Sequence, residues 1–350
     1  MLEIDGSRFS GSGTIVRYSL ALAALTRQPI RIINMRAKRA APGLRPQHLA
    51  AVNACEALTR GHAEGASVGS RRMTFHPGPS IHGGRYTFQI GTAGSTTMLA
   101  YSLLPLALFA DGPCDMLLTG GVFQDFAPSP FHIQQLLLPL LQRMGATAVL
   151  TLKRPGYVPR GSGEIELSVQ PLTRPLAPIR LLEQGALRRV RGIALASRLK
   201  PRRVAERMAA AGRQTLADAG LTVEVAIDEQ EESTSAQPGA AFALWAETET
   251  ECRIGADMAG AIGRPAERIG RTTARRLLDD LRSGATVDRH LADQLVLFAA
   301  LAAGTSRYRM PRPTEHVRTN CWLIDRLLGA TSREDDRWIE ITGIGLRPGR

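Results

Sequence analysis

Hydrophobic residues recur along the chain in blocks that begin at a glycine-rich segment, continue as an apolar stretch of helical length and end in a short strand-like stretch. The first block is GSGTIVRYSLALAALTRQPIRIINM at residues 11–35, and the second is GTAGSTTMLAYSLLPLALFADGPCDMLLTGG at residues 91–121. Residues 290–310, HLADQLVLFAALAAGTSRYRM, form a third copy. We therefore predict a protein built from repeated units of helices and strands.

Two more apolar helices follow the same order. Residues 47–61 and 131–145 each precede a short strand-like stretch, at residues 71–78 and 146–154. Each of these helices ends at a glycine, which is a typical stop signal. The alternation of helices with short strands predicts an α+β fold made of α/β-type repeats.

The pattern changes near residue 186. From there the chain reads as strand, helix, strand, acidic loop and strand, and the helix AERIGRTTARRLLDDLRSG closes the region. We expect a small inserted α/β domain at 186–283 that interrupts a larger repeat-built domain at 1–185 and 284–350. The acidic stretch DEQEESTSAQPGAA at residues 228–241 is interpreted as a solvated loop.

The net charge of the chain indicates the class of its binding partner. The net charge is +12 and the pI is about 10.5, which favours a polyanion and above all a nucleic acid. Lys38, Lys153 and Lys200 are the only lysines, and the remaining basic residues are arginines. A GC-rich genome and a preference for guanidinium groups that grip phosphate both explain this bias.

Cysteine usage and terminal sequence indicate the compartment. The four cysteines are far apart in the sequence, so they form no CxxC metal or redox motif. The first residues carry no secretory signal, and no uninterrupted apolar run reaches the length of a membrane span. We expect reduced thiols in a cytoplasmic protein with no membrane partner.

A basic loop and a glycine loop are the first candidate sites. MRAKRAAPGLRPQH contains Arg36, Arg39, Gln47 and His48 directly before an apolar helix. Such a run is either a solvated face or an anion cradle at a helix N-terminus, and the proline, glycine and Gln-His pair favour the cradle. DGSRFSGSGTIVR matches neither the P-loop nor the dinucleotide fingerprint, but it places Arg17 one turn into a helix, where it can face an anion.

His316 stands at the start of an apolar helix in PTEHVRTNCWLIDRLLGA, and Asp293 and Gln294 open the preceding one. A lone histidine there is either structural or a nucleophile, since neutral imidazole is available near pH 7. No lysine lies in a Lys-x-Asp-Gly motif. If the chain carries a covalent nucleotide, histidine is the candidate.

These segments together resemble the RNA 3′-terminal phosphate cyclases over nearly the whole chain. RAKRAAPGLRPQHLAAV is similar to the family's Arg-x-x-Arg…Pro-Gly-Leu…Gln-His block, and GTAGSTTMLAYSLLPLALFADGP to its Gly-Ser-Ala-Gly-Ser helix. GYVPRGSGEI, HLADQLVLFAALAAG and EHVRTN follow three more family segments in the same order.

The resemblance implies repeated units of two helices and a four-stranded sheet with a small insert. It also implies ATP-dependent conversion of an RNA 3′-terminal phosphate to a 2′,3′-cyclic phosphate, with ATP, a divalent metal (Mg²⁺ or Mn²⁺) and 3′-phosphorylated RNA as partners. His316 would become adenylylated. Asp293, Gln294, His290 and Tyr101 would lie in the nucleotide site, and the phosphate or RNA-end ligands would be Arg17, Arg36, Arg39, Gln47 and His48.

The chain departs from the family pattern at five positions in this region. Ser10 stands where the family has a glutamate near the metal, so the metal ligands are unassigned. Thr14 and Tyr101 each replace a glutamine, His290 replaces a tyrosine, and Phe131 replaces an aspartate. Two alternatives are a non-catalytic cyclase-like protein of RNA processing and an enolpyruvyl-type transferase of similar repeat architecture.

Overall fold

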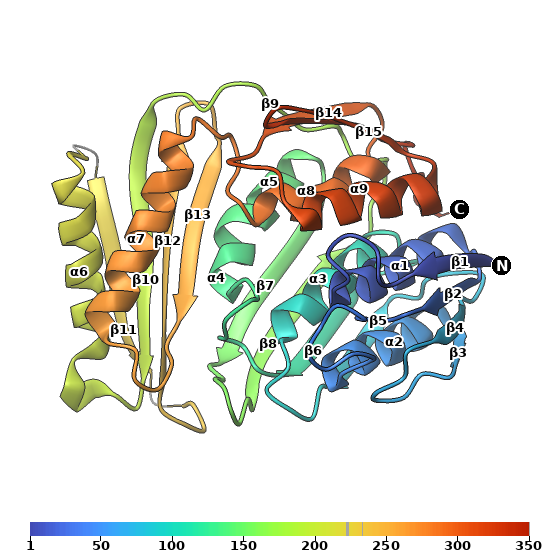
Figure 1. Cartoon of the computed structure of the whole chain (residues 1–350), viewed down its shortest axis with the longest axis horizontal. Helices are drawn as coiled ribbons and strands as arrows, with labels where there is room; N and C mark the ends of the chain where they lie inside the picture. The colour runs from blue at the N-terminus through green and yellow to red at the C-terminus, as the bar shows by residue number, and fades with distance from the viewer. Residues whose placement is uncertain (222–223, 233, 350) are drawn as a thin grey trace.

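The computed structural model describes residues 1–221, 224–232 and 234–349. Three units in it follow one order of elements, strand–helix–strand–helix–strand–strand (Figure 1). The first unit contains β1 (Leu2–Asp5), α1 (Gly13–Thr26), β2 (Ile30–Ile33), α2 (Pro46–Thr59), β3 (His62–Glu64) and β4 (Met73–His76).

The second unit has the same order, with its second helix divided. It contains β5 (Gly84–Gln89), α3 (Thr96–Leu108), β6 (Cys114–Gly120), α4 (Pro130–His132), a π-helical turn (Ile133–Leu137), α5 (Leu138–Arg143), β7 (Thr147–Arg154) and β8 (Gly163–Gln170). The single helix predicted at 131–145 is therefore continuous in the chain but changes its hydrogen-bond spacing in the middle.

The third unit is split by the insert after its first strand. It contains β9 (Arg180–Leu181) and then, beyond the insert, α8 (Leu291–Leu301), β14 (Thr305–Arg309), α9 (Glu315–Leu328), β15 (Thr331–Asp335) and β16 (Trp338–Thr342). The three sheets have equivalent strand orders, β1-β2-β4-β3, β5-β6-β8-β7 and β9-β14-β16-β15. In each sheet the first two strands are parallel and the other pairs are antiparallel.

The insert forms a fourth sheet with two helices. It contains β10 (Leu187–Ser197), a short 3₁₀ turn (Lys200–Arg202), α6 (Val204–Asp218), β11 (Glu224–Glu232), β12 (Gly239–Thr248), β13 (Arg253–Ala259) and α7 (Ala266–Arg282). Its strand order is β11-β10-β12-β13. The α+β fold of repeated units is thus confirmed. The domain boundaries at 186 and 283 stay a prediction, with which these bounds agree.

Side chains of β12 alternate between two cores. Phe242 and Leu244 pack with α6 and α7 in a cluster of the insert's own, whereas Ala243 and Trp245 belong to the main core of the molecule. This alternation follows from the two-residue period of a strand. The insert sheet is therefore covered on both faces, by its own helices and by the second unit.

Helices α1, α3 and α8 are apolar on all sides because other elements surround them. Helix α1 packs against α2, α3 and α9, and α8 packs against α9 (Figure 1). A helix that is hydrophobic on every side is typical of such a buried position. Helices α1, α3 and α9 each have a serine or threonine at the N-cap. The hydroxyl groups of Ser12, Ser95 and Thr314, respectively, accept hydrogen bonds from backbone N–H groups in the first turns of these helices.

The interpretation of residues 228–241 as a solvated loop was wrong for most of its length. β11 continues to Glu232 and β12 starts at Gly239, while Ser233 lies outside the described residues. β11 is an edge strand, so the side chains of residues 228–230 remain exposed. Charged residues are common on edge strands because they discourage pairing with another chain. No helix in the described part of the chain combines the length and apolar character of a membrane span.

Candidate functional site

The N-terminal ends of α1 and α9 meet around His316. His316 lies in the first turn of α9, and its Nδ1 is 3.5 Å from Oγ1 of Thr14 in α1. One turn further along α9, Oγ1 of Thr319 donates to Oγ of Ser10 over 2.9 Å. The glycine loop of the first unit is thus fixed against the helix that carries the predicted nucleophile.

The imidazole of His316 is held neutral. Burial is the largest cause that lowers its pKa below the ordinary value of 6.5, and the positive charges of Arg39 and Arg17 lower it further. The ring remains partly exposed to solvent. A neutral and accessible imidazole retains the lone pair that a nucleophile needs.

Asp293 and Gln294 lie at the start of α8, in the same region. Asn320 of α9 donates from Nδ2 to the backbone oxygen of Asp293 over 2.8 Å, which joins α8 to α9. Burial and the nearby Asp288 raise the pKa of Asp293 to about 7, against the opposing charges of His132 and Arg17. Oε1 of Gln294 is buried without a hydrogen-bond partner in the described structure.

Arg17 is a buried cation without a protein anion bound to it. Its side chain is 6% exposed, and it has no ion pair or hydrogen bond to another residue in the described ranges. Burial lowers the pKa of Arg17 to about 10, and the effects of Tyr18 and Asp293 only partly offset it. An unpaired buried guanidinium is costly, so its position favours an anionic ligand.

His48 stands beside Arg17 as a neutral donor. Its Nδ1 accepts a hydrogen bond from the backbone N–H of Arg45 over 3.1 Å, so the proton of the neutral ring is on Nε2. Burial and the charge of Arg17 lower the pKa of His48 to about 2. A Cβ placed on Gly13 would lie 2.0 Å from Nε2 of His48 and 3.1 Å from Nη1 of Arg17. The absence of a side chain at Gly13 therefore lets His48 and Arg17 pack closely against the start of α1.

The remaining predicted anion ligands have contacts that shape the loops. Arg36 donates from Nη1 to the carbonyl oxygens of Ala41 and Gly43, over 2.6 and 2.7 Å. Oε1 of Gln47 accepts from the backbone N–H of Ser95 over 2.9 Å and so joins α2 to the entry of α3. Arg39 is exposed.

Two of the departures from the family pattern form packed contacts. Tyr101 is buried, accepts from the hydroxyl of Tyr18 over 2.6 Å, and donates to the backbone oxygen of Gln294. Its hydroxyl thus has two protein partners, and its contact with a nucleotide stays a prediction. Phe131 is buried and packs on Phe123 with ring centroids 5.5 Å apart.

A buried carboxylate beside this region was missed from the sequence. Asp288 accepts from the backbone N–H groups of His290 and Leu291 at the start of α8, both over 2.9 Å. It also accepts from Nε2 of His132 over 3.2 Å and from the backbone N–H of Gly255 in the insert over 3.2 Å. An aspartate shortly before an apolar helix is an N-cap signal, but its partners 33 and 156 residues away leave no local pattern.

His290 lies next to this carboxylate. Its centroid is 6.1 Å from that of His132, in an edge-to-face arrangement. Burial in the surrounding protein lowers the pKa of His290, and Asp288 acts in the opposite direction. The residue as a whole is partly accessible to solvent at the N-terminal end of α8.

The site offers a divalent metal few ligands of its own. No group of three or more His, Cys, Asp or Glu ligands converges there in the described part of the chain. Ser10 supplies only a hydroxyl, and Oδ1 of Asp5 is occupied by Ser7 and Asn34. Hard cations prefer carboxylate oxygens, so these residues do not by themselves fit a Mg²⁺ cage.

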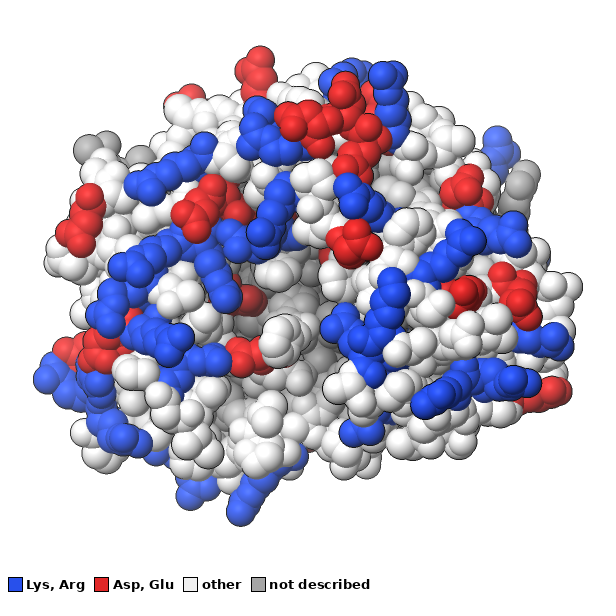
Figure 2. All heavy atoms as spheres, viewed as in Figure 1, with Lys and Arg blue, Asp and Glu red and all other residues white. Residues whose placement is uncertain are grey.

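Arginine and lysine side chains surround a hollow on the face that carries these elements. Figure 2 shows the hollow near the middle of the molecule, with basic side chains over the insert on one side and over the N-terminal unit on the other. The overall charge of +12 is thus partly concentrated around a concave surface. Concave basic surfaces raise the local concentration of anionic ligands.

Known proteins are similar to this sequence over nearly its whole length. A family model described as RNA 3′-terminal phosphate cyclase matches residues 8–333. The chain is 38% identical to the RNA 3′-terminal phosphate cyclase of Pyrobaculum neutrophilum over 98% of this chain and 99% of the relative. It is 39% identical to that of Hyperthermus butylicus (95% and 93% covered) and 40% identical to that of Caldivirga maquilingensis (94% and 93% covered).

Among solved structures, the enolpyruvyl transferase NikO from Streptomyces tendae aligns with a TM-score of 0.29 at 14% identity, covering all of this chain and 52% of that one. This similarity is too weak to support an inference. The family model and the full-length relatives are specific, and they agree with the order of motifs along the chain. The chain belongs to the RNA 3′-terminal phosphate cyclase family.

Proposed function

We propose that this protein is an ATP-dependent RNA 3′-terminal phosphate cyclase that acts through an adenylylated His316. The observation that carries the proposal is the position of a neutral imidazole at the meeting point of two helix starts, close enough to the buried, unpaired Arg17 for that guanidinium to lower its pKa. The names of the full-length relatives support the substrate class.

In the first step, His316 attacks the α-phosphorus of ATP. A bond forms between the imidazole nitrogen and phosphorus, the bond from phosphorus to the bridging oxygen breaks, and pyrophosphate leaves. Thr14 faces Nδ1, so a proton on Nδ1 directed at the threonine hydroxyl leaves the lone pair on Nε2 for the attack. The contact of 3.5 Å is long, so the hydroxyl orients the ring more than it activates it.

In the second step, an oxygen of the RNA 3′-phosphate attacks the adenylyl phosphorus, and the bond to the imidazole breaks. The neighbouring 2′-hydroxyl then attacks the 3′-phosphorus, AMP leaves, and a 2′,3′-cyclic phosphate remains. The hydroxyl proton goes to solvent or to the departing AMP. The histidine is regenerated in the second step, so a single nucleophile supports repeated turnover.

Arg17 and the Nε2–H group of His48 would stabilise negative charge on the phosphates. Both donors lie close to Gly13, at the positive end of the dipole of α1. Donors that are fixed before the reaction contribute more to transition-state stabilisation than mobile ones, because they need no reorganisation. We assign Asp293, Gln294 and His290 to the nucleotide side of the site, and Arg36 and Arg39 to the RNA end.

A divalent metal would be held mainly by the phosphate oxygens of ATP. Ser10 occupies the position where the family has a glutamate, and its hydroxyl already contacts Thr319 and Ser12. Mg²⁺ commonly reaches enzymes in this way, bound to substrate phosphates and few protein ligands. The metal is therefore proposed to act as a partner of ATP.

The test is a cyclisation assay with an RNA that ends in a 3′-phosphate, in the presence of ATP and Mg²⁺. We expect a phosphatase-resistant 2′,3′-cyclic end with the wild type and with the control variant His62→Asn, and no product with His316→Asn. Full activity of His316→Asn would overturn the assignment. Absence of product from every protein, with RNA binding retained, would favour the non-catalytic alternative.

A further inference from the structure

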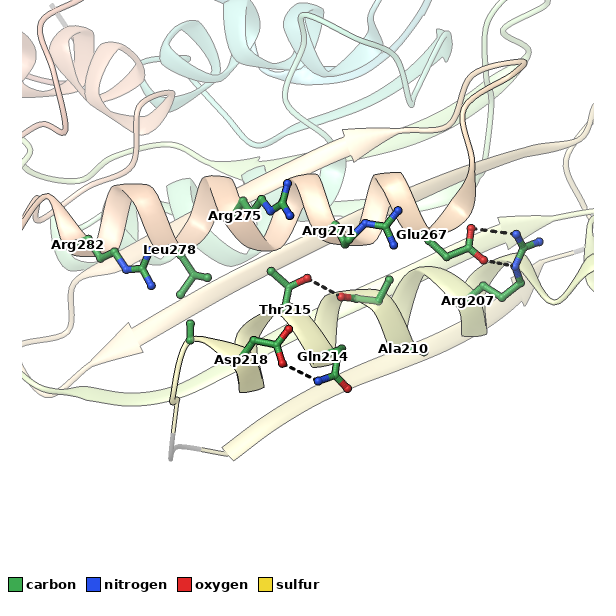
Figure 3. A pocket seen from close by; sticks show the side chains of 12 residues that line it. Arg207, Ala210, Gln214, Thr215, Asp218, Glu267, Arg271, Arg275, Leu278 and Arg282 are labelled. Atoms are coloured by element: carbon green, nitrogen blue, oxygen red, sulfur yellow. Dashed lines mark hydrogen bonds and ion pairs between the residues drawn. The ribbon is translucent and has the colours of Figure 1, made fainter.

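A groove of about 640 Å³ lies between α6 and α7 of the insert, away from the site described above (Figure 3). Its lining includes the small residues Ala210 and Ala211 of α6, Ala219 directly after that helix, and Leu278 of α7. The two helices approach closely, since a Cβ on Gly270 would lie 2.2 Å from the backbone oxygen of Met208. Small side chains on α6 therefore leave an open channel along α7.

Three arginines of α7 line this groove without protein partners. Arg271, Arg275 and Arg282 have no ion pair or hydrogen bond to another residue in the described ranges. The acidic side chains nearby are occupied: Glu267 binds Arg207 through two hydrogen bonds of 2.7 and 3.0 Å, and Asp218 accepts from Gln214 over 2.7 Å (Figure 3). The hydrogen bond from the neutral amide of Gln214 leaves the charge of Asp218 in place, so the lining carries four arginines against two carboxylates and its net charge is positive.

The spacing of these arginines suits an extended polyanion. Eleven residues of helix separate Arg271 from Arg282, a rise of about 16 Å. One nucleic-acid strand carries about five phosphates over such a length at 3.4 Å per nucleotide. Guanidinium groups are well matched to phosphate oxygens.

We propose that this groove binds the phosphate backbone of the RNA upstream of its 3′ end. The proposal rests on the proposed function, which supplies an RNA substrate. The basic side chains over α6 and α7 lie on the same face as the central hollow, so one strand can follow both (Figure 2). No large apolar side chain lining the groove is exposed, which disfavours an amphipathic peptide as the ligand.

The test compares two triple variants of the full-length protein. Arg271→Gln/Arg275→Gln/Arg282→Gln removes the groove charges and retains good helix formers, whereas Arg85→Gln/Arg174→Gln/Arg333→Gln removes three exposed charges elsewhere. Binding of 3′-phosphorylated RNAs of about 4 and about 20 nucleotides is measured by fluorescence anisotropy at several salt concentrations. Circular dichroism melting checks the fold.

We expect the groove variant to bind the long RNA at least tenfold more weakly, with a salt slope reduced by about 2, because each single-strand phosphate contact contributes about 0.7. Its affinity for the short RNA and its reaction with ATP should equal those of the control variant. Equal losses in both triple variants would overturn the proposal, as would a groove variant that loses binding only to polyglutamate or anionic vesicles. Failure of the proposed function would give a different result. The protein would then not cyclise RNA, but the groove variant would still bind the long RNA more weakly than the control variant does.

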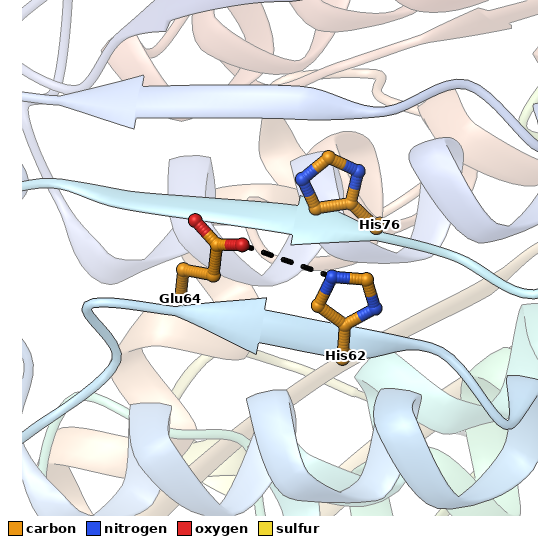
Figure 4. Close-up of side chains that lie close together, drawn as sticks. All are labelled: His62, Glu64 and His76. Atoms are coloured by element: carbon orange, nitrogen blue, oxygen red, sulfur yellow. Dashed lines mark ion pairs between the residues drawn. The ribbon is translucent and has the colours of Figure 1, made fainter.

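An independent observation concerns the hairpin β3–β4 of the first unit. His62 and Glu64 lie two residues apart on β3 and so share one face, and His76 pairs with His62 across the strands (Figure 4). One ligand atom from each of the three lies within 4.8 Å of the others, and Nε2 of His62 is 3.9 Å from Oε1 of Glu64. The first two residues are exposed and His76 is half-buried.

These three residues are the ligand types of a transition-metal site. Zinc binds histidine nitrogen and carboxylate oxygen at about 2.0–2.2 Å with tetrahedral geometry, which places ligand atoms about 3.4 Å apart. The two imidazole rings are stacked, with centroids 4.7 Å apart and an angle of 8° between their planes. The side chain of His62 is exposed, so its ring has room to rotate about its terminal torsion and turn a nitrogen lone pair toward a metal ion.

The geometry points to a solvent-open site for Zn²⁺ or a similar transition-metal cation, with water as the fourth ligand. Two imidazoles distinguish it from a Mg²⁺ or Mn²⁺ site, which needs oxygen ligands. The site lies beyond the C-terminal end of α2, whereas His48 lies in the first turn of that helix; the 14 residues of α2 span about 20 Å. Metal bound there would join β3 to β4 without contacting the candidate active site.

Calorimetric titration of the metal-free protein with ZnCl₂ tests this site, together with the absorption spectrum of bound Co²⁺. We expect a Co²⁺ spectrum of tetrahedral type, and at least tenfold weaker Zn²⁺ binding in His62→Ala and in His76→Ala. The control variant His82→Ala, and the adenylylation activity of all three variants, should match the wild type. Equal Zn²⁺ binding by the wild type and the two site variants would place the metal elsewhere and overturn the proposal.

Discussion

The charge of Asp293 depends on residues from three separate segments. Asp288 and burial favour its protonated form, while Arg17 and His132 favour the carboxylate. The resulting pKa of about 7 is above the ordinary value of 3.8, so the folded state binds this proton more tightly than the unfolded state. The contribution of protonated Asp293 to the free energy of unfolding is fully present below pH 3.8 and is lost as the pH rises through about 7.

Asp293→Asn should remove this pH dependence, because asparagine cannot ionise. We expect the melting temperature of the variant, relative to that of the wild type, to increase between about pH 5 and about pH 8. Thermal unfolding of both proteins at several pH values measures the difference. A difference that stays constant over this range would show that Asp293 does not titrate there.

Ser10→Glu should lower the metal concentration needed for adenylylation. The serine hydroxyl is replaced by a carboxylate, which hard cations prefer, on the loop that faces the first turns of α9. Titration of enzyme–AMP formation with Mg²⁺ and with Mn²⁺ at fixed ATP compares the two proteins. Superimposable curves would mean that position 10 does not face the metal.

Sequence patterns point to individual residues where a motif surrounds them, but they do not reveal contacts between residues that are distant in the chain. His316 and Arg17 were chosen from their local segments, and the structure places both near the start of α1. The bonds from Gln47 to Ser95 and from Tyr101 to Gln294 span 48 and 193 residues. No periodicity in the chain encodes such pairs, so their occupied side chains were not foreseen.

At the level of elements, the first turn of α1 depends on the absence of a side chain at Gly13. The missing side chain allows His48 and Arg17 to approach the end of the helix where the dipole is positive. The sequence pattern predicted a helix after the glycine-rich segment, with Arg17 one turn into it. The donors come from α1 and α2, which the sequence alone does not bring together.

Gly13→Ala should weaken ATP binding and adenylylation by at least tenfold, because the new methyl group would displace the ring of His48 and crowd Arg17. The matched control is Gly112→Ala, whose Cβ would meet no atom closer than 4.0 Å. Binding of ATP by calorimetry and the rate of enzyme–AMP formation are measured for both. Equal values for Gly13→Ala and Gly112→Ala would remove this position from the phosphate site.

Periodicity alone established the repeated elements, because each unit uses the same sequence of apolar helix and short strand. The division of the helix at 130–143 by a π-helical turn and the extension of the acidic segment into β11 did not follow from it. An edge strand needs apolar residues on only one face and tolerates charge on the other, so its pattern resembles that of a loop.

At the scale of the whole molecule, one buried carboxylate joins three parts of the fold. Asp288 binds His132 of the second unit, the start of α8 in the third unit, and Gly255 of the insert. The pKa of Asp288 is lowered to about 2, despite its burial, because His132 and the backbone N–H donors stabilise the carboxylate. This contact aligns α8, and therefore Asp293 and Gln294, with the rest of the cleft.

Asp288→Asn should lower the free energy of unfolding by about 3 kcal/mol, the usual effect of removing one partner of a buried charged pair. Urea unfolding measures the change. The control Asp111→Asn breaks the exposed contact with His82 and should change it by less than about 1 kcal/mol. Equal effects of the two substitutions would show that Asp288 does not join the units.

The central claim is that His316 carries AMP during the reaction, and mapping the adenylyl group tests it most directly. The protein is incubated with ATP and Mg²⁺, digested near neutral pH and analysed by tandem mass spectrometry. We predict one adenylyl group on the peptide that contains His316, released by acid as a phosphoramidate is, and absent from His316→Asn. An adenylyl group on a lysine or on another histidine, or unchanged labelling of His316→Asn, would contradict the account.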